Sequence, residues 1–131
     1  MRKILTISLL VSILILSGLS LIGCDGDETG QVSYATDIDQ KIFRSARYNC
    51  IGCHTSALSP HLDLTTYDGL MAGSDNGPVV EPGNADNSFM YEKISQETPS
   101  RGIRMPQGGP YLNSVEIKMI EDWINQGAKD N

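Results

Sequence analysis

The 131-residue sequence has few of the residues that protein metal sites, nucleic-acid interfaces and large cores require. It contains two His, three Cys, one Trp and two Phe, and its 10 Lys and Arg are outnumbered by 16 Asp and Glu, which gives a formal net charge of −6. The shortage of positive charge argues against nucleic acid as a partner. Because His and Cys are so few, a structural zinc site with four protein ligands is difficult to assemble.

Large apolar side chains are also scarce in the segment that we expect to fold. Between residues 37 and 128, 18 of 92 positions are Leu, Ile, Val or Phe, which is close to the composition of charged chains that stay disordered. A large apolar cofactor would fill this deficit. The sequence therefore predicts that the domain folds poorly without its cofactor, because cofactor contacts replace the missing side-chain packing.

Two of the three cysteines stand beside a histidine in the run Cys50-Ile-Gly-Cys-His54. This spacing is typical of covalent haem attachment. Cys50 and Cys53 can each add to a vinyl group at one edge of a porphyrin, and His54 can then bind the iron. The motif predicts one covalently attached haem c, with two thioether anchors and His54 as an axial ligand.

Three other interpretations of the motif are open: a structural zinc site, a redox dithiol and an accidental C-x-x-C pair. Zinc lacks ligands, because only Cys24 and His61 remain outside the motif and Cys24 has another expected role. A redox dithiol usually begins a helix that follows a strand, and no strand-like alternation precedes Cys50. Haem attachment is therefore the favoured interpretation.

The first 23 residues have the pattern of an export signal. Arg2 and Lys3 precede an apolar stretch over residues 4–22, and the run Leu-Ile-Gly-Cys24 ends it. That run resembles the lipobox of bacterial lipoproteins, which implies cleavage before Cys24 and lipidation of its thiol. An uncleaved membrane-spanning helix is the alternative, although serines and a glycine dilute its 19 residues. We expect an exported, membrane-anchored lipoprotein with residues 1–23 as its signal peptide.

The rest of the chain divides into a tether and one domain. Residues 24–36 are polar and without periodicity, so they are predicted to be a lipidated flexible tether, and residues 37–131 form the domain. Asp25 resembles the inner-membrane retention signal of enteric bacteria, which places the domain on the periplasmic side of the inner membrane. Without its signal peptide the chain has a formal charge of −8, so redox partners with a basic docking surface are expected.

The domain is predicted to be all-α, with three to five short helices wrapped around one covalently bound haem. A first helix capped by Thr36 or Asp37 leads into the haem motif. Further helices are expected from Thr65 or Thr66, over residues 86–95, and after Asn113. Asn113 forms a capping-box pattern with Glu116, and this last helix is expected to end at Gly127 and to cross the first one.

Met105 is the candidate for the second axial ligand. It lies in a loop over residues 101–111 that is rich in Gly and Pro. Because Pro106 favours an extended backbone at Met105, the thioether can be directed across a pocket. The main rival is His61, only seven residues after His54, which would more naturally reach the haem rim or solvent. The other methionines of the domain, Met71, Met90 and Met119, fit helix faces and are expected in the core.

From residue 42 to residue 128 the chain resembles single-haem cytochrome c domains, particularly the type common in planctomycetes. The resemblance lies in the haem motif, in the runs Leu-Asp-Leu-Thr-Thr-Tyr-Asp-Gly-Leu-Met-Ala-Gly (62–73) and Val-Glu-Pro-Gly-Asn (80–84), in Met105-Pro106, and in Asp-Trp-Ile-Asn-Gln-Gly-Ala (122–128). It implies that Met105 is the second axial ligand, because a late Met-Pro pair often has this role in cytochromes c.

These features together predict electron transfer by a membrane-anchored mono-haem cytochrome with His54 and Met105 as axial ligands, and no enzymatic activity. Two alternatives belong to other classes. One is a haem-based ligand sensor or a peroxidase-like enzyme, in which Met105 would leave the iron open. The other is an electron-transfer subunit of an exported dehydrogenase complex.

Overall fold

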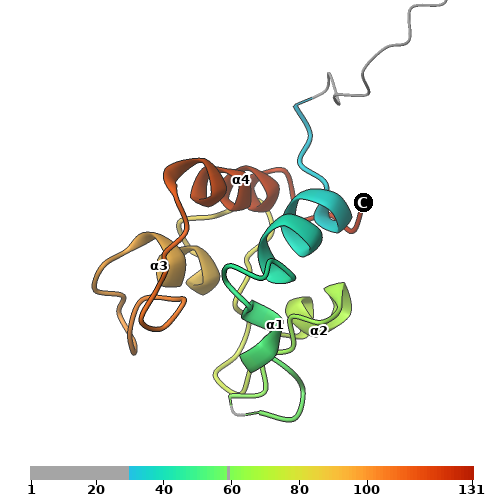
Figure 1. Cartoon of the computed structure of the whole chain (residues 1–131). Helices are drawn as coiled ribbons and strands as arrows, with labels where there is room; N and C mark the ends of the chain where they lie inside the picture. The colour runs from blue at the N-terminus through green and yellow to red at the C-terminus, as the bar shows by residue number, and fades with distance from the viewer. Residues whose placement is uncertain (1–29, 59) are drawn as a thin grey trace, which may run out of the picture.

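The computed structural model describes residues 30–58 and 60–131, which form five short helices and no named strand (Figure 1). The helices are η1 (Tyr34–Phe43), α1 (Cys50–Cys53), α2 (Tyr67–Ala72), α3 (Phe89–Ser95) and α4 (Ser114–Asn125). The all-α class is thereby confirmed. The expected signal peptide and the lipidation site Cys24 lie outside the described residues. Within those residues, no helix has the length and apolar character needed to span a membrane.

The first helix begins earlier than expected, at Tyr34, because Ser33 rather than Thr36 or Asp37 is its cap. The Ser33 hydroxyl accepts a hydrogen bond from the Thr36 N–H at 3.3 Å, and the Ser33 N–H donates to the Asp37 carboxylate at 2.9 Å. The Ile38 N–H also donates to the Ser33 carbonyl at 3.2 Å, five residues back. This longer step makes η1 a π-helix, a wider form than the α-helix that the sequence suggested.

The start of η1 is held by the other end of the chain. The Tyr34 N–H donates to the Asn131 side chain at 2.9 Å, and the Ala35 N–H donates to the Asn131 carbonyl at 3.0 Å. The Val32 N–H donates to the Gln126 side chain at 2.8 Å. Residues 32–36, expected to be part of the tether, therefore belong to the packed domain, since their backbone groups find partners near the C-terminus.

Helix α4 forms as the sequence predicts and supplies much of the core. The Asn113 side chain accepts from the Val115 and Glu116 N–H groups, and the Glu116 carboxylate accepts from the Asn113 N–H, which completes the capping box. Ile120, Trp123 and Ile124 are buried on one face. Helix α4 lies against η1 (Figure 1), as expected of the last helix and the first. The ring centroids of Trp123 and Tyr34 lie 5.6 Å apart in this contact.

The two remaining helices are shorter and are held by loops. Thr66 caps α2, since its hydroxyl accepts from the Gly69 N–H at 3.0 Å. Helix α3 begins at Phe89, three residues later than expected, because Asp86 and Asn87 lie in the turn before it. The buried Ser88 hydroxyl donates to the Asn84 carbonyl at 2.9 Å and so ties this turn to the preceding loop.

Candidate cofactor site

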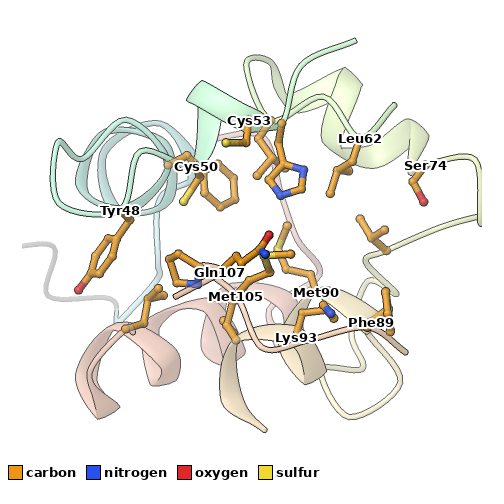
Figure 2. Close-up of a pocket in the computed structure, with 18 of the residues that line it drawn as sticks. Tyr48, Cys50, Cys53, Leu62, Ser74, Phe89, Met90, Lys93, Met105 and Gln107 are labelled. Atoms are coloured by element: carbon orange, nitrogen blue, oxygen red, sulfur yellow. The ribbon is translucent and has the colours of Figure 1, made fainter. Parts of the chain in front are cut away.

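A cavity of about 640 Å³ lies between α1, α3 and the loop that leads into α4 (Figure 2). Its volume falls within the range of about 300–1,000 Å³ that is typical of small-molecule and cofactor sites. Its lining is largely apolar. Its apolar members include Ile42, Phe43, Leu62, Leu64, Val79, Phe89, Met90, Ile94, Met105, Leu112 and Ile120. The scarcity of core side chains in the sequence therefore corresponds to a cavity in the fold, where a large apolar group can complete the packing.

The single turn of α1 presents the haem motif to this cavity. Asn49 precedes the turn with a left-handed φ of +48°, and its N–H donates to the Ser45 carbonyl at 2.8 Å. The His54 N–H then donates to the Cys50 carbonyl at 2.9 Å and closes the turn. Cys50, Cys53 and His54 all line the cavity, as haem attachment requires, and both thiols are free of disulfides.

The environment of Cys50 disfavours the redox-dithiol interpretation. Burial raises the pKa of the Cys50 thiol to about 11, and the Cys50 sulfur lies 3.9 Å from the Ile42 carbonyl oxygen. A dithiol oxidoreductase instead depends on a thiol whose pKa is lowered, so that the reactive thiolate is populated. Cys50 is thus a protonated thiol at neutral pH, facing an apolar cavity.

The zinc interpretation also finds no support in the described part of the chain. No group of three or more His, Cys, Asp or Glu side chains lies close enough there to hold a metal ion. A structural zinc site needs four such ligands. His54 faces the apolar cavity.

His54 is positioned by its backbone and kept neutral by its surroundings. Its carbonyl accepts a hydrogen bond from the Leu64 N–H at 3.0 Å, in addition to the bond from its own N–H to Cys50. Burial lowers the pKa of the imidazole below its ordinary value. The neutral imidazole is the form that binds metal ions, so His54 is prepared to act as a ligand.

Met105 lies on the opposite wall of the cavity from Cys50 and Cys53 (Figure 2). Its loop is held by the end of α3, because the Met105 N–H donates to the Lys93 carbonyl at 2.7 Å and the Arg104 guanidinium donates to the Ile94 carbonyl at 3.1 Å. The peptide bond between Met105 and Pro106 is cis. One cavity therefore brings together the predicted thioether anchors, the imidazole and the thioether ligand.

His61, the rival ligand, lies outside the lining of the cavity. Its side chain is 56% exposed, and its Nδ1 lies 2.8 Å from a carboxylate oxygen of Asp75. This contact joins the loop after the haem motif to the turn after α2, where the Asp75 N–H also donates to the Pro60 carbonyl at 2.9 Å. The structure thus gives His61 a partner at the surface.

Sequence reasoning missed several residues of this site. Met90 was expected only in the core, and it is buried, but it also lines the cavity as a second thioether. Tyr48, Lys93 and Arg101 line the cavity too. The two cations could have been suspected from their positions beside the Met105 loop, whereas Met90 gives no signal beyond its place on a helix face.

The lining as a whole fits a covalently bound haem. It offers two free thiols one helical turn apart, an adjacent imidazole, thioethers on the facing wall, and apolar side chains between them. These are the groups that hold haem in c-type cytochromes. The donor set of the cavity and its apolar character therefore agree with the motif.

Comparison with known proteins agrees with the resemblance. Residues 50–107 match the family model described as planctomycete cytochrome C, a segment that begins at the first cysteine of the haem motif and ends just after Met105. No curated protein and no solved structure matches the chain. Residues 50–107 are therefore similar to planctomycete cytochrome C, a likeness that agrees with a haem cofactor and with haem-based electron transfer.

Proposed function

We propose that this protein is a membrane-anchored electron carrier with one covalently attached haem, held between His54 and Met105. The observation that carries the proposal is that both side chains line the cavity into which Cys50 and Cys53 present their thiols. His61, by contrast, is engaged with Asp75 at the surface. The supported axial pair is therefore an imidazole and a thioether.

Each of these residues has a distinct role in the proposal. Cys50 and Cys53 fix one edge of the cofactor through thioether bonds, so that it stays with the chain in both oxidation states. His54 and Met105 would each supply a ligand to the iron, and the two together would leave no site for an external ligand. The bound haem supplies reversible one-electron chemistry of its iron.

The proposed ligand pair favours the role of an electron carrier over that of an enzyme. With His54 and Met105 both as ligands, the bound haem would offer a substrate no open position on its iron and would supply only reversible one-electron chemistry. Met105 also raises the reduction potential relative to a second histidine. The apolar lining supports the same role, because it keeps water away from the cofactor.

The proposed location rests on the sequence. Cys24, after residues 1–23, would carry the lipid that anchors the exported domain to the periplasmic face of the inner membrane. The described domain contains 13 Asp and Glu against 8 Lys and Arg, so its overall charge favours redox partners with a basic docking surface.

Visible spectra of the purified protein in both redox states test the proposal. A low-spin, six-coordinate haem that does not bind carbon monoxide when reduced is the expected result. Ready binding of carbon monoxide to the unmodified protein would favour the sensor or the peroxidase-like enzyme. Stoichiometric co-purification with a large exported dehydrogenase would make the protein a subunit of that complex instead of a free carrier.

A further inference from the structure

Two cations at the cavity form no ion pair with any residue that the structure describes. Lys93 and Arg101 both line the cavity and both approach the ring of Phe89, with the Lys93 Nζ at 5.7 Å and the Arg101 Cζ at 4.5 Å from its centroid. Within residues 30–58 and 60–131, the ion pairs involve Lys41, Arg44, His61 and Lys118. In a chain of net negative charge, two unpaired cations beside one apolar cavity indicate an anionic ligand.

The ammonium group of Lys93 is held in place by neutral groups. It donates to the backbone carbonyls of Arg101 and Ile103. An ammonium group has three N–H donors, and these two carbonyls leave one donor for a carboxylate. Burial lowers the pKa of Lys93 and the charge of the neighbouring Glu92 opposes this shift, but Glu92 forms no ion pair with Lys93 and does not line the cavity. Lys93 is therefore fixed beside the cavity with its charge available to a carboxylate.

Other charged groups near this pair are already engaged. The Glu92 carboxylate accepts from the N–H and the hydroxyl of Ser100, and these bonds, followed by the charges of Lys93 and Arg101, lower its pKa. Arg104 stacks on the ring of Tyr111, with its Cζ 4.4 Å from the ring centroid. Across the cavity, Asp75 is paired with His61. Lys93 and Arg101 are thus the cations that line the cavity, and no carboxylate of the described chain faces them from its lining.

The position of the pair identifies the anion. Figure 2 shows Lys93 and Phe89 toward the end of the cavity remote from Cys50. The two propionate groups of a haem lie on the edge of the porphyrin opposite the vinyl groups that cysteines capture. We propose that Lys93 and Arg101 form a carboxylate-binding site that takes the haem propionates, an inference that rests on the proposed function.

The same contacts tie this site to the axial ligand. Lys93 binds the loop through its side chain at Arg101 and Ile103, and its own carbonyl accepts the Met105 N–H. A carboxylate on Lys93 and Arg101 therefore fastens the loop that carries Met105. Lys93 acts as a positioning residue for this loop.

The experiment measures the reduction potential of the isolated holoprotein as a function of pH. Cations within about 4–6 Å lower the pKa of a carboxyl group by about 1–3 units, and partial exposure places this site at the lower end. In the double variant Lys93→Gln/Arg101→Gln, the acid-side inflection caused by propionate protonation should move up by about one pH unit. The charge-matched control is Lys41→Gln/Lys118→Gln, whose ion pairs lie outside the cavity lining.

A conservative variant separates charge from folding. Lys93→Arg keeps the cation and should retain the inflection of the unmodified protein, even where the loop is perturbed. If the reduction potentials of the double variant and its control depend on pH in the same way, the propionate site is refuted. The same result is expected if these cations bind the carboxylates of a docking protein instead. If the unmodified protein carries no covalent haem, the proposed function fails together with this inference. If the unmodified protein has the spectrum of a His/Met haem but the double variant shows no shift of the inflection, only this inference is refuted.

Discussion

The Met105 N–H donates a 2.7 Å hydrogen bond to the carbonyl of Lys93, near the end of α3. This bond joins the loop that carries the proposed thioether ligand to a helix whose Met90 and Ile94 are buried in the core. A loop rich in glycine and proline would otherwise be free to move. Met105 is therefore presented to the cavity by a fixed element, which is what a permanent axial ligand requires.

Loss of the two motif cysteines should release the cofactor and destabilise the domain. In the variant Cys50→Ser/Cys53→Ser, we expect haem to be extracted by acid and organic solvent, whereas it should stay with the unmodified polypeptide. The domain without haem should also unfold at lower denaturant concentration, because the cavity of about 640 Å³ loses its apolar contents. Cys24→Ser is the control. Equal haem extraction from the double variant and from this control would contradict covalent attachment through Cys50 and Cys53.

Cys24 should determine membrane attachment. We expect Cys24→Ala to leave the precursor unprocessed or to release the protein from membranes, because the lipid on this thiol is the proposed anchor. Membrane fractionation and mass spectrometry of the mature N-terminus measure this. A mature protein that begins at another residue and bears no lipid would refute the lipoprotein assignment.

Tyr34 should make the protein sensitive to alkaline pH. Its ring is buried against Trp123 and Tyr67, its hydroxyl has no hydrogen-bond partner in the described structure, and burial raises its pKa from 10.0 to about 12. Since the folded-state pKa is raised, the stability from the neutral phenol is fully present below pH 10 and is lost as pH rises toward 12.

The variant Tyr34→Phe isolates this effect. At neutral pH its free energy of unfolding should equal or exceed that of the unmodified protein, because a buried, unpartnered hydroxyl is removed while the ring contacts remain. Above pH 10 it should lose less stability, by about 1–3 kcal/mol near the upper end of the window. Denaturant unfolding of both holoproteins at neutral and alkaline pH measures the difference. Parallel losses in the two proteins would show that Tyr34 does not titrate as described.

Local signals in the sequence predicted the elements whose ends depend on nearby residues. The capping box of Asn113 and Glu116 and the cap at Thr66 each require contacts within a few positions, and both formed as expected. The start of η1 was misplaced because Ser33 is its cap and because its first backbone groups are also bound by Asn131, at the other end of the chain. No local pattern reveals such a partner.

The site shows the same division between local and tertiary information. The spacing of Cys50, Cys53 and His54 is local, and these residues face one cavity. The addition of Met90, Lys93 and Arg101 to its lining depends on how α3 packs against the Met105 loop, which the sequence alone does not determine. The engagement of His61 with Asp75, 14 residues away, likewise required the fold.

Met105 is proposed to bind the haem iron and so to exclude external ligands. Carbon monoxide binding by a set of single variants tests this proposal most directly. Met105→Ala should keep its covalent haem, bind carbon monoxide readily when reduced, and show a lower reduction potential, because the thioether no longer stabilises ferrous iron. His61→Ala should remain closed. Met90→Leu, which replaces the other cavity thioether with an apolar side chain of similar size, should remain closed too. If Met105→Ala stays low-spin and closed while His61→Ala or Met90→Leu opens, the axial pair proposed here is wrong.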